Sequence, residues 1–144
     1  MKHLFTIAAL LTAAVLWSSA QSPAVTYVDH DKVTAALAKS GPLVTASNLT
    51  VSGSHRTGPG QVEVHNKETD VLYVTDGEAT FVMGGTMVGG KMTRPDQLLG
   101  TDIQGGETHR LVKGDVIVVQ AGTPHWFKEV PTSVSYFVVK VLKP

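Results

Sequence analysis

The 144-residue sequence contains no cysteine. This absence excludes a disulfide framework, a zinc-finger scaffold, iron–sulfur chemistry and thiolate-bound copper. An excess of one charge sign is also lacking, because 12 lysines and arginines balance 12 aspartates and glutamates. No basic run is long enough to neutralise a row of phosphates, so the composition gives nucleic-acid binding little support.

The sequence has one long apolar stretch, from Leu4 to Trp17. It is shorter than the roughly 20 residues that a bilayer-spanning helix needs, which disfavours the alternative of a membrane anchor. The stretch follows Lys2 and leads into small residues that end at Ala20, a pattern typical of a secretory signal. We therefore expect residues 1–20 to be cleaved after Ala20. Residues 21–144 should then form a single periplasmic or secreted domain that has no membrane attachment.

Glycine, proline and short valine-rich runs dominate the rest of the chain, with 14 glycines and 7 prolines, and this favours an all-β domain with many turns. One short helix is expected at about Asp31–Lys39, capped by Asp29 or Asp31 and ended by Gly41-Pro42. The alternation of apolar and polar residues predicts strands at about Leu43–Ala46, Leu49–Arg56, Val62–His65, Val71–Thr75, Ala79–Met83, Glu107–Leu111, Val116–Gln120, His125–Glu129 and Val134–Leu142.

Two features of the loops carry predictions of their own. Asp76-Gly77 predicts a tight hairpin between the strands on either side of it. The glycine-rich segment from Gly84 to Gly106 predicts a long, irregular surface excursion that acts as a lid or an oligomer contact.

Polar residues that interrupt the strand patterns are the candidates for chemistry. Glu63 and His65 are two residues apart, so both side chains point to the same face of a strand. A tight connection after His65 could place Asp70 opposite that imidazole, and His125, after a Gly-Thr-Pro turn, supplies a second imidazole. Such an oxygen- and nitrogen-rich set suits a divalent first-row ion, namely zinc, manganese, iron or nickel.

The spacing of these residues resembles the two motifs of the cupins, small double-stranded β-helix barrels on a jelly-roll plan. The first cupin motif has His-x-His, three or four residues, Glu, six residues and Gly; here Glu63-x-His65, four residues, Asp70, six residues and Gly77 follow one another. The second has Gly, five residues, Pro-x-Gly, two residues and His, and the segment from Gly114 to His125 keeps that spacing. The resemblance covers about residues 58–140. It implies a cupin-type jelly-roll β-barrel.

By this resemblance Glu63, His65, Asp70 and His125 occupy the four metal-ligand positions. Glu63 stands where the first His is usual, and Asp70 replaces a longer Glu. A shorter acid has less reach toward an ion, and Glu63 could instead be a catalytic base beside a two-histidine centre. The alternative to a metal site is a cupin-like barrel that has lost its metal. In that case Asp70 would be a turn residue and His125 an ordinary core histidine.

The resemblance leads to a first hypothesis of an exported metal-binding cupin that acts as a small-molecule metalloenzyme of the dioxygenase, isomerase or lyase type. The alternatives are a non-catalytic barrel that binds a small molecule or sugar, and a protein whose ion only ties strands together. A small organic ligand is expected in the barrel mouth.

Weaker candidates for the surroundings of the site are His55 and Arg56, on the strand before the first motif, and Tyr136 and Lys140, on one face of the last strand. Lys140, if buried, could bind an anionic substrate or donate a proton. The resemblance also implies a homodimer, with residues 43–56 as a candidate edge.

Overall fold

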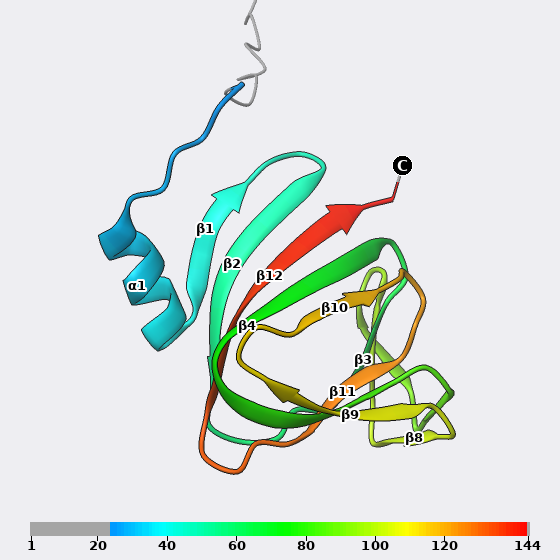
Figure 1. Ribbon diagram of the computed structural model, residues 1–144. Coiled ribbons are helices and arrows are strands. Elements are labelled where there is room, and N and C mark those ends of the chain that lie inside the picture. Colours follow the sequence, from blue (N-terminus) through cyan, green and yellow to red (C-terminus); the bar gives the residue numbers. More distant parts are fainter. Residues whose placement is uncertain (1–23, 144) are drawn as a thin grey trace, which may run out of the picture.

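The computed structural model of the protein describes residues 24–143, which form a strongly curved antiparallel β structure with one helix on its outside (Figure 1). The proposed signal, residues 1–20, lies outside the described residues. Within the described part of the chain, no helix is both long and apolar enough to cross a membrane. The strands are β1 (Gly41–Thr45), β2 (Leu49–Arg56), β3 (Val62–His65), β4 (Glu68–Met83), β5 (Thr86–Val88), β6 (Lys91–Arg94), β7 (Gln97–Gly100), β8 (Asp102–Gln104), β9 (Glu107–Val112), β10 (Val116–Val119), β11 (His125–Glu129) and β12 (Val134–Leu142).

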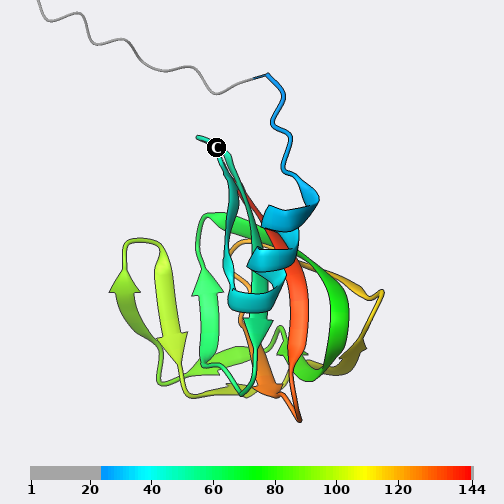
Figure 2. The same ribbon diagram turned by 90° about the vertical axis from the view of Figure 1, so that its left-hand side faces the viewer.

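The helix α1 (His30–Lys39) lies across the wall that contains β1, β2 and β12 (Figure 2). Its first turn is capped by Asp29, whose carboxylate accepts a hydrogen bond from the backbone N–H of Lys32 at 3.0 Å. Ala36 is the buried residue of the helix and rests on Gly53 of β2. A Cβ at position 53 would lie 2.7 Å from the carbonyl carbon of Ala36, so the close contact requires glycine. The predicted helix is confirmed.

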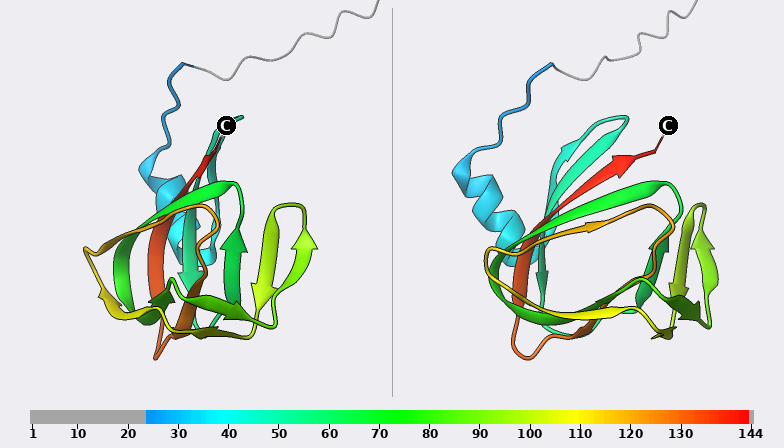
Figure 3. Two further views of the ribbon diagram at one scale, coloured as in Figure 1. Left: turned by 90° about the vertical axis from the view of Figure 1, so that its right-hand side faces the viewer. Right: turned by 45° about the vertical axis from the view of Figure 1, so that its right-hand side comes forward.

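The strands of the main sheet follow the order β1-β2-β12-β4-β11-β3-β7-β6, and β9 and β10 also pair with β4. The sheet curls so that its two halves face each other, as Figure 3 shows, without closing into a continuous ring. The short strands β5 and β8 form a separate pair. This architecture confirms the expected all-β jelly-roll fold with a short N-terminal helix.

The predicted hairpin at Asp76-Gly77 is wrong, because β4 runs without interruption through both residues. The first half of β4 pairs with β12 and β10, and its second half pairs with β11 and β9. Between the halves, the register against β12 skips Thr75 and leaves a β-bulge. Gly77 has φ +74°, and a Cβ there would lie 2.0 Å from the carbonyl oxygen of Ser133. The Asp-Gly pair therefore bends one strand from one half of the sheet into the other.

The segment from Gly84 to Gly106 is also more regular than predicted, since it contains the four strands β5 to β8. β7 pairs with β3 along its whole length and so extends the sheet beside the first motif. Ile103 of β8 packs with Val62 and Val82 on the outer side of that sheet. The segment is thus an integral part of the fold and not an irregular excursion.

The main core lies between the two halves of the sheet. Phe81, Val74 and Val134 have no exposed surface. The ring of Phe127 packs edge-on against Phe81 and stacks on Tyr136, with centroids 4.9 Å apart in both pairs. Beyond these rings the barrel interior becomes polar, and the motif residues lie there.

Candidate metal centre

Glu63 and His65 reach the barrel interior because of strand alternation on β3. Val62 and Val64 are buried on the opposite face, which fixes the direction of the two polar side chains. β11 pairs with β3 through His125 and Glu63. Cross-strand partners project to the same face, so this pairing brings the second imidazole beside the carboxylate.

The turn before His125 is tied to the first motif by the backbone. The N–H of Gly122 donates to the carbonyl oxygen of His65 at 2.8 Å. The Nδ1 of His125 lies 3.2 Å from the carbonyl oxygen of Thr123, which can only accept, so Nδ1 carries the hydrogen. The lone pair of Nε2 then faces the interior, which is the tautomer of a metal-binding histidine.

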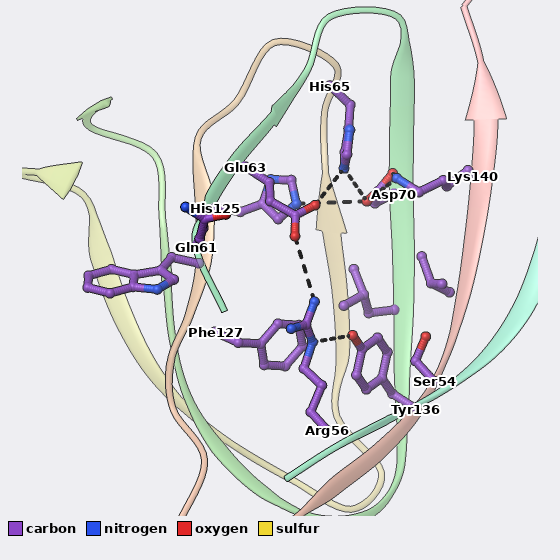
Figure 4. A pocket seen from close by; sticks show the side chains of 13 residues that line it. Ser54, Arg56, Gln61, Glu63, His65, Asp70, His125, Phe127, Tyr136 and Lys140 are labelled. Carbon is purple, nitrogen blue, oxygen red and sulfur yellow. Dashed lines mark hydrogen bonds and ion pairs between the residues drawn. The ribbon is translucent and has the colours of Figure 1, made fainter. Parts of the chain in front are cut away.

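The structure brings all four predicted ligand residues together (Figure 4). The Nε2 of His65 lies 3.3 Å from Oε2 of Glu63 and 3.6 Å from Oδ2 of Asp70. The same Asp70 oxygen lies 3.8 Å from Nε2 of His125. Metal bonds of about 2.0–2.2 Å at tetrahedral angles place neighbouring donor atoms about 3.4 Å apart. The donor atoms of Glu63, His65 and His125 all lie within 4.8 Å of one another, and Asp70 forms a second such group with His65 and Glu68. The chemistry and the spacing of these donors suit a divalent ion.

Burial and charge set the protonation of these groups. Burial would raise the pKa of Glu63, but a hydrogen bond with His65 and the nearby His125 and Arg56 outweigh it and hold that pKa below its usual value. Burial lowers the pKa of His125, against the hydrogen bond to Thr123 and the charge of Asp70. A carboxylate and a neutral imidazole are the forms that bind metal.

A sequence model of the family described as Cupin matches residues 18–144. The chain belongs to the cupin family.

Several solved structures resemble this chain at low sequence identity. A Bacillus halodurans protein, BH2720, matches with a TM-score of 0.59, 16% identity and 86% coverage of both chains. A cupin superfamily protein from Desulfitobacterium hafniense has a TM-score of 0.49 and 17% identity, with 72% of this chain and 75% of that chain covered. An 11S globulin from Wrightia tinctoria, whose structure reveals an auxin binding site, has a TM-score of 0.50 and 13% identity. The match covers 67% of this chain and 21% of the globulin. No curated protein sequence matches the chain.

Lys140 lines the cupin cavity, as its position on β12 predicts, but its ammonium is engaged. Nζ lies 2.9 Å from both carboxylate oxygens of Asp70 and 3.1 Å from Oε2 of Glu68. Glu68 is not among the residues that the motifs indicate, although its spacing of two residues from Asp70 on one strand could have revealed it. The ion pair leaves Lys140 a poor candidate for direct binding of an anionic substrate.

Arg56 lies on the other side of the cavity, below Glu63 (Figure 4). Its Nε donates to the hydroxyl oxygen of Tyr136 at 2.8 Å, its guanidinium lies 4.8 Å from the centroid of Phe127, and Nη2 is 3.7 Å from Oε1 of Glu63. His55, the neighbouring candidate, does not line this cavity and instead contacts the Ser135 hydroxyl at 2.8 Å. Arg56 is thus a fixed cation at the cavity wall.

The cavity has a volume of about 170 Å³. Its walls combine the candidate metal ligands with aromatic and aliphatic side chains, a composition common in small-molecule sites. The lining residues are Ser54, Arg56, Gln61, Glu63, His65, Asp70, Leu72, His125, Trp126, Phe127, Tyr136, Val138 and Lys140.

Proposed function

We propose that this cupin binds one divalent transition metal ion, zinc, manganese, iron or nickel, and acts on a small organic ligand in the barrel. Glu63, His65 and His125 are the principal ligands, and Asp70 is the fourth candidate. The observation that carries the proposal is the convergence of two imidazoles and two carboxylates on one cavity, where three pairs of their donor atoms are 3.3–3.8 Å apart.

When bound, such an ion supplies Lewis acidity toward a carbonyl or hydroxyl group, or redox chemistry with dioxygen. Glu63 is ionised at neutral pH, because His65, His125 and Arg56 hold its pKa low against the effect of burial. The ionised carboxylate is the form that can bind the ion or accept a proton from the ligand. These roles support dioxygenase, isomerase or lyase chemistry, with Glu63 as both a ligand and the candidate base.

The ligand we propose is small and carries a carboxylate or a similar anionic group. A cavity of about 170 Å³ admits few heavy atoms. Arg56 offers a planar cationic edge to such a group, and Tyr136 and Phe127 hold that edge in place. We expect Arg56→Ala to weaken binding of a small carboxylate such as lactate to the metal-loaded protein, while binding of the neutral lactamide changes little.

Elemental analysis of the protein, produced in metal-supplemented medium, tests the site. We expect about one ion per chain, lost in the His65→Ala/His125→Ala double variant. A His30→Ala/His109→Ala variant, which removes two exposed imidazoles, is the matched control and should keep its metal. Absence of metal from the unaltered protein would overturn the proposal and favour a metal-free barrel that binds its ligand without transforming it.

Two further experiments separate catalysis from binding. Turnover that disappears in Glu63→Gln while the metal is retained supports an enzyme. Stabilisation by a small ligand without turnover supports the non-catalytic binding barrel.

We also propose export to the periplasm or the medium, with cleavage after Ala20, and homodimerisation through the β1–β2 edge. The export proposal rests on the sequence pattern of residues 1–20. The dimer proposal is consistent with the position of β1 at one edge of the main sheet. Mass spectrometry of the exported protein should find Gln21 at the N-terminus, and light scattering should give twice the chain mass.

A further inference from the structure

Lys140 and Asp70 are direct partners across the β12–β4 ladder, so the backbone register brings the two side chains together. The ammonium reaches both oxygens of Asp70 at 2.9 Å and Oε2 of Glu68 at 3.1 Å. An ammonium has three N–H donors, and three carboxylate oxygens surround this one. Lys140 is therefore saturated by its two acidic neighbours.

Asp70 is held in this pair with little access to water, since its side chain is 6% exposed. The oxygen that lies nearest to the imidazoles, Oδ2, is also one of the two oxygens that Lys140 contacts. An ion bound to Oδ2 would have to share that oxygen with the Lys140 ammonium, which its contacts with both Asp70 oxygens and with Glu68 hold in place. The ammonium both withdraws charge from the oxygen and repels a divalent ion.

Among the described residues 24–143, no lysine or arginine lies as close to Glu63 or His125 as Lys140 lies to Asp70. The cation nearest Glu63 is Arg56, whose Nη2 lies 3.7 Å from Oε1, on the side away from His65. The donor atoms of Glu63, His65 and His125 form one compact group. Those of His65, Glu68 and Asp70 form a second group, and both acids of that group contact the Lys140 ammonium. Of the four candidate ligands, Asp70 is the one already engaged by a cation at hydrogen-bond distance.

We propose that Lys140 is a positioning residue that withholds Asp70 from the metal, so that Glu63, His65 and His125 hold the ion and Asp70 serves as the counter-ion of Lys140. This inference rests on the proposed metal site. The ion would thus have three protein ligands and open coordination positions, although four side chains at the site could act as ligands. Removal of the lysine charge should let Asp70 become the fourth ligand.

Titration with Co²⁺ tests the inference, with affinity and the visible absorption of the bound ion as the two measurements. In Lys140→Met the freed Asp70 should join the ion, tighten binding at least about tenfold and alter the absorption bands. The Lys140→Met/Asp70→Asn double variant removes the pair as a unit. It should bind Co²⁺ within about threefold of the unaltered protein and show the same bands. Lys113→Met, which removes an exposed lysine outside the cavity, is the control for net charge and should change neither measurement.

Other outcomes overturn the inference. If Asp70 is a full ligand beside Lys140, the double variant loses a ligand and binds at least about tenfold more weakly. If Lys140→Met binds no more tightly than the unaltered protein, the lysine does not restrain Asp70. Should Lys140→Met fail to fold, the double variant alone decides, because Glu68 is then the one acid of the pair that has lost its cation. Failure of the unaltered protein and of every variant to bind Co²⁺ overturns the metal site as well.

Discussion

The bend of β4 at Gly77, beside the bulge at Thr75, should be a point on which the whole barrel depends. β4 carries Asp70 in one half of the sheet and Phe81 in the other, and the bend between the halves lies at this glycine. Gly77→Ala would place a methyl group 2.0 Å from the carbonyl oxygen of Ser133, whereas ordinary contacts begin at 3.4 Å. That carbonyl accepts a hydrogen bond from the N–H of Glu78 at 3.2 Å, so moving it away also weakens the ladder.

Three contributions set the size of the effect. A left-handed backbone costs an alanine about 1–2 kcal/mol, relief of the clash about 1–3 kcal/mol, and the disturbed hydrogen bond about 1 kcal/mol. We expect Gly77→Ala to lower the free energy of unfolding by about 4 kcal/mol, a large share of the roughly 5–15 kcal/mol that is typical of a domain.

Two other glycines separate these contributions in urea unfolding followed by circular dichroism. Gly114 has φ +98°, and nothing lies within 4 Å of the position that a methyl group would take there, so Gly114→Ala should cost only the backbone strain, about 1–2 kcal/mol. Gly58 has open space and no left-handed backbone, so Gly58→Ala should change stability by less than about 1 kcal/mol. Equal losses in Gly77→Ala and Gly114→Ala would refute the role of the close approach to Ser133.

Three further predictions concern the core and the metal-free site. Phe81→Ala should cost about 3–5 kcal/mol of unfolding free energy, whereas Val118→Ala, at a side chain that is 50% exposed, should cost less than about 1 kcal/mol in the same urea assay. In the metal-free protein, burial lowers the pKa of His125 below 6.5, the value expected in the unfolded chain. Between these two pKa values the unfolded chain binds a proton at this imidazole and the folded chain does not. The free energy of unfolding should therefore fall as the pH drops below 6.5. The lowered pKa of Glu63 should cause a further loss of folding stability below pH 4.5. Measured as the urea midpoint at a series of pH values, the loss of stability below neutrality should be smaller in His125→Gln. An unchanged loss in that variant would contradict the role of His125. Removal of metal with a chelator should leave the far-ultraviolet circular dichroism of the barrel in place, and collapse of that signal would support an ion that ties the strands together.

The strands that carry the site could be predicted because one face of each is buried. In β3, Val62 and Val64 alternate with Glu63 and His65, and the structure has the strand at the predicted Val62–His65. β11 and β12 likewise have their predicted bounds. A one-residue shift would bury charge and expose valine, so the pattern admits a single register. That constraint also brings the four predicted ligand residues to one place.

The predictions are wrong where local sequence permits two structures. Asp76-Gly77 supplies a left-handed glycine, which both a hairpin turn and a sharp bend within a strand can use. Only the pairing with β12, more than fifty residues later, decides that the strand continues. The strands between Gly84 and Gly106 escape prediction for a similar reason, since they are three or four residues long and β6 is exposed throughout. Such strands are stabilised by distant partners rather than by their own alternation.

Charge pairing explains why this acidic interior should persist without an ion. Asp70 and Glu68 share the ammonium of Lys140, and Glu63 faces the guanidinium of Arg56. Buried carboxylates without such partners would repel one another, and the barrel would then need a metal in order to fold. Three carboxylates therefore share two cations, so the site carries a net charge of −1 without a metal, and a divalent ion would bring it to +1. This excess of positive charge would favour an anionic ligand beside the ion. The pairing of the acids with cations would also let the barrel stay folded without the ion, so that the ion serves function and not stability.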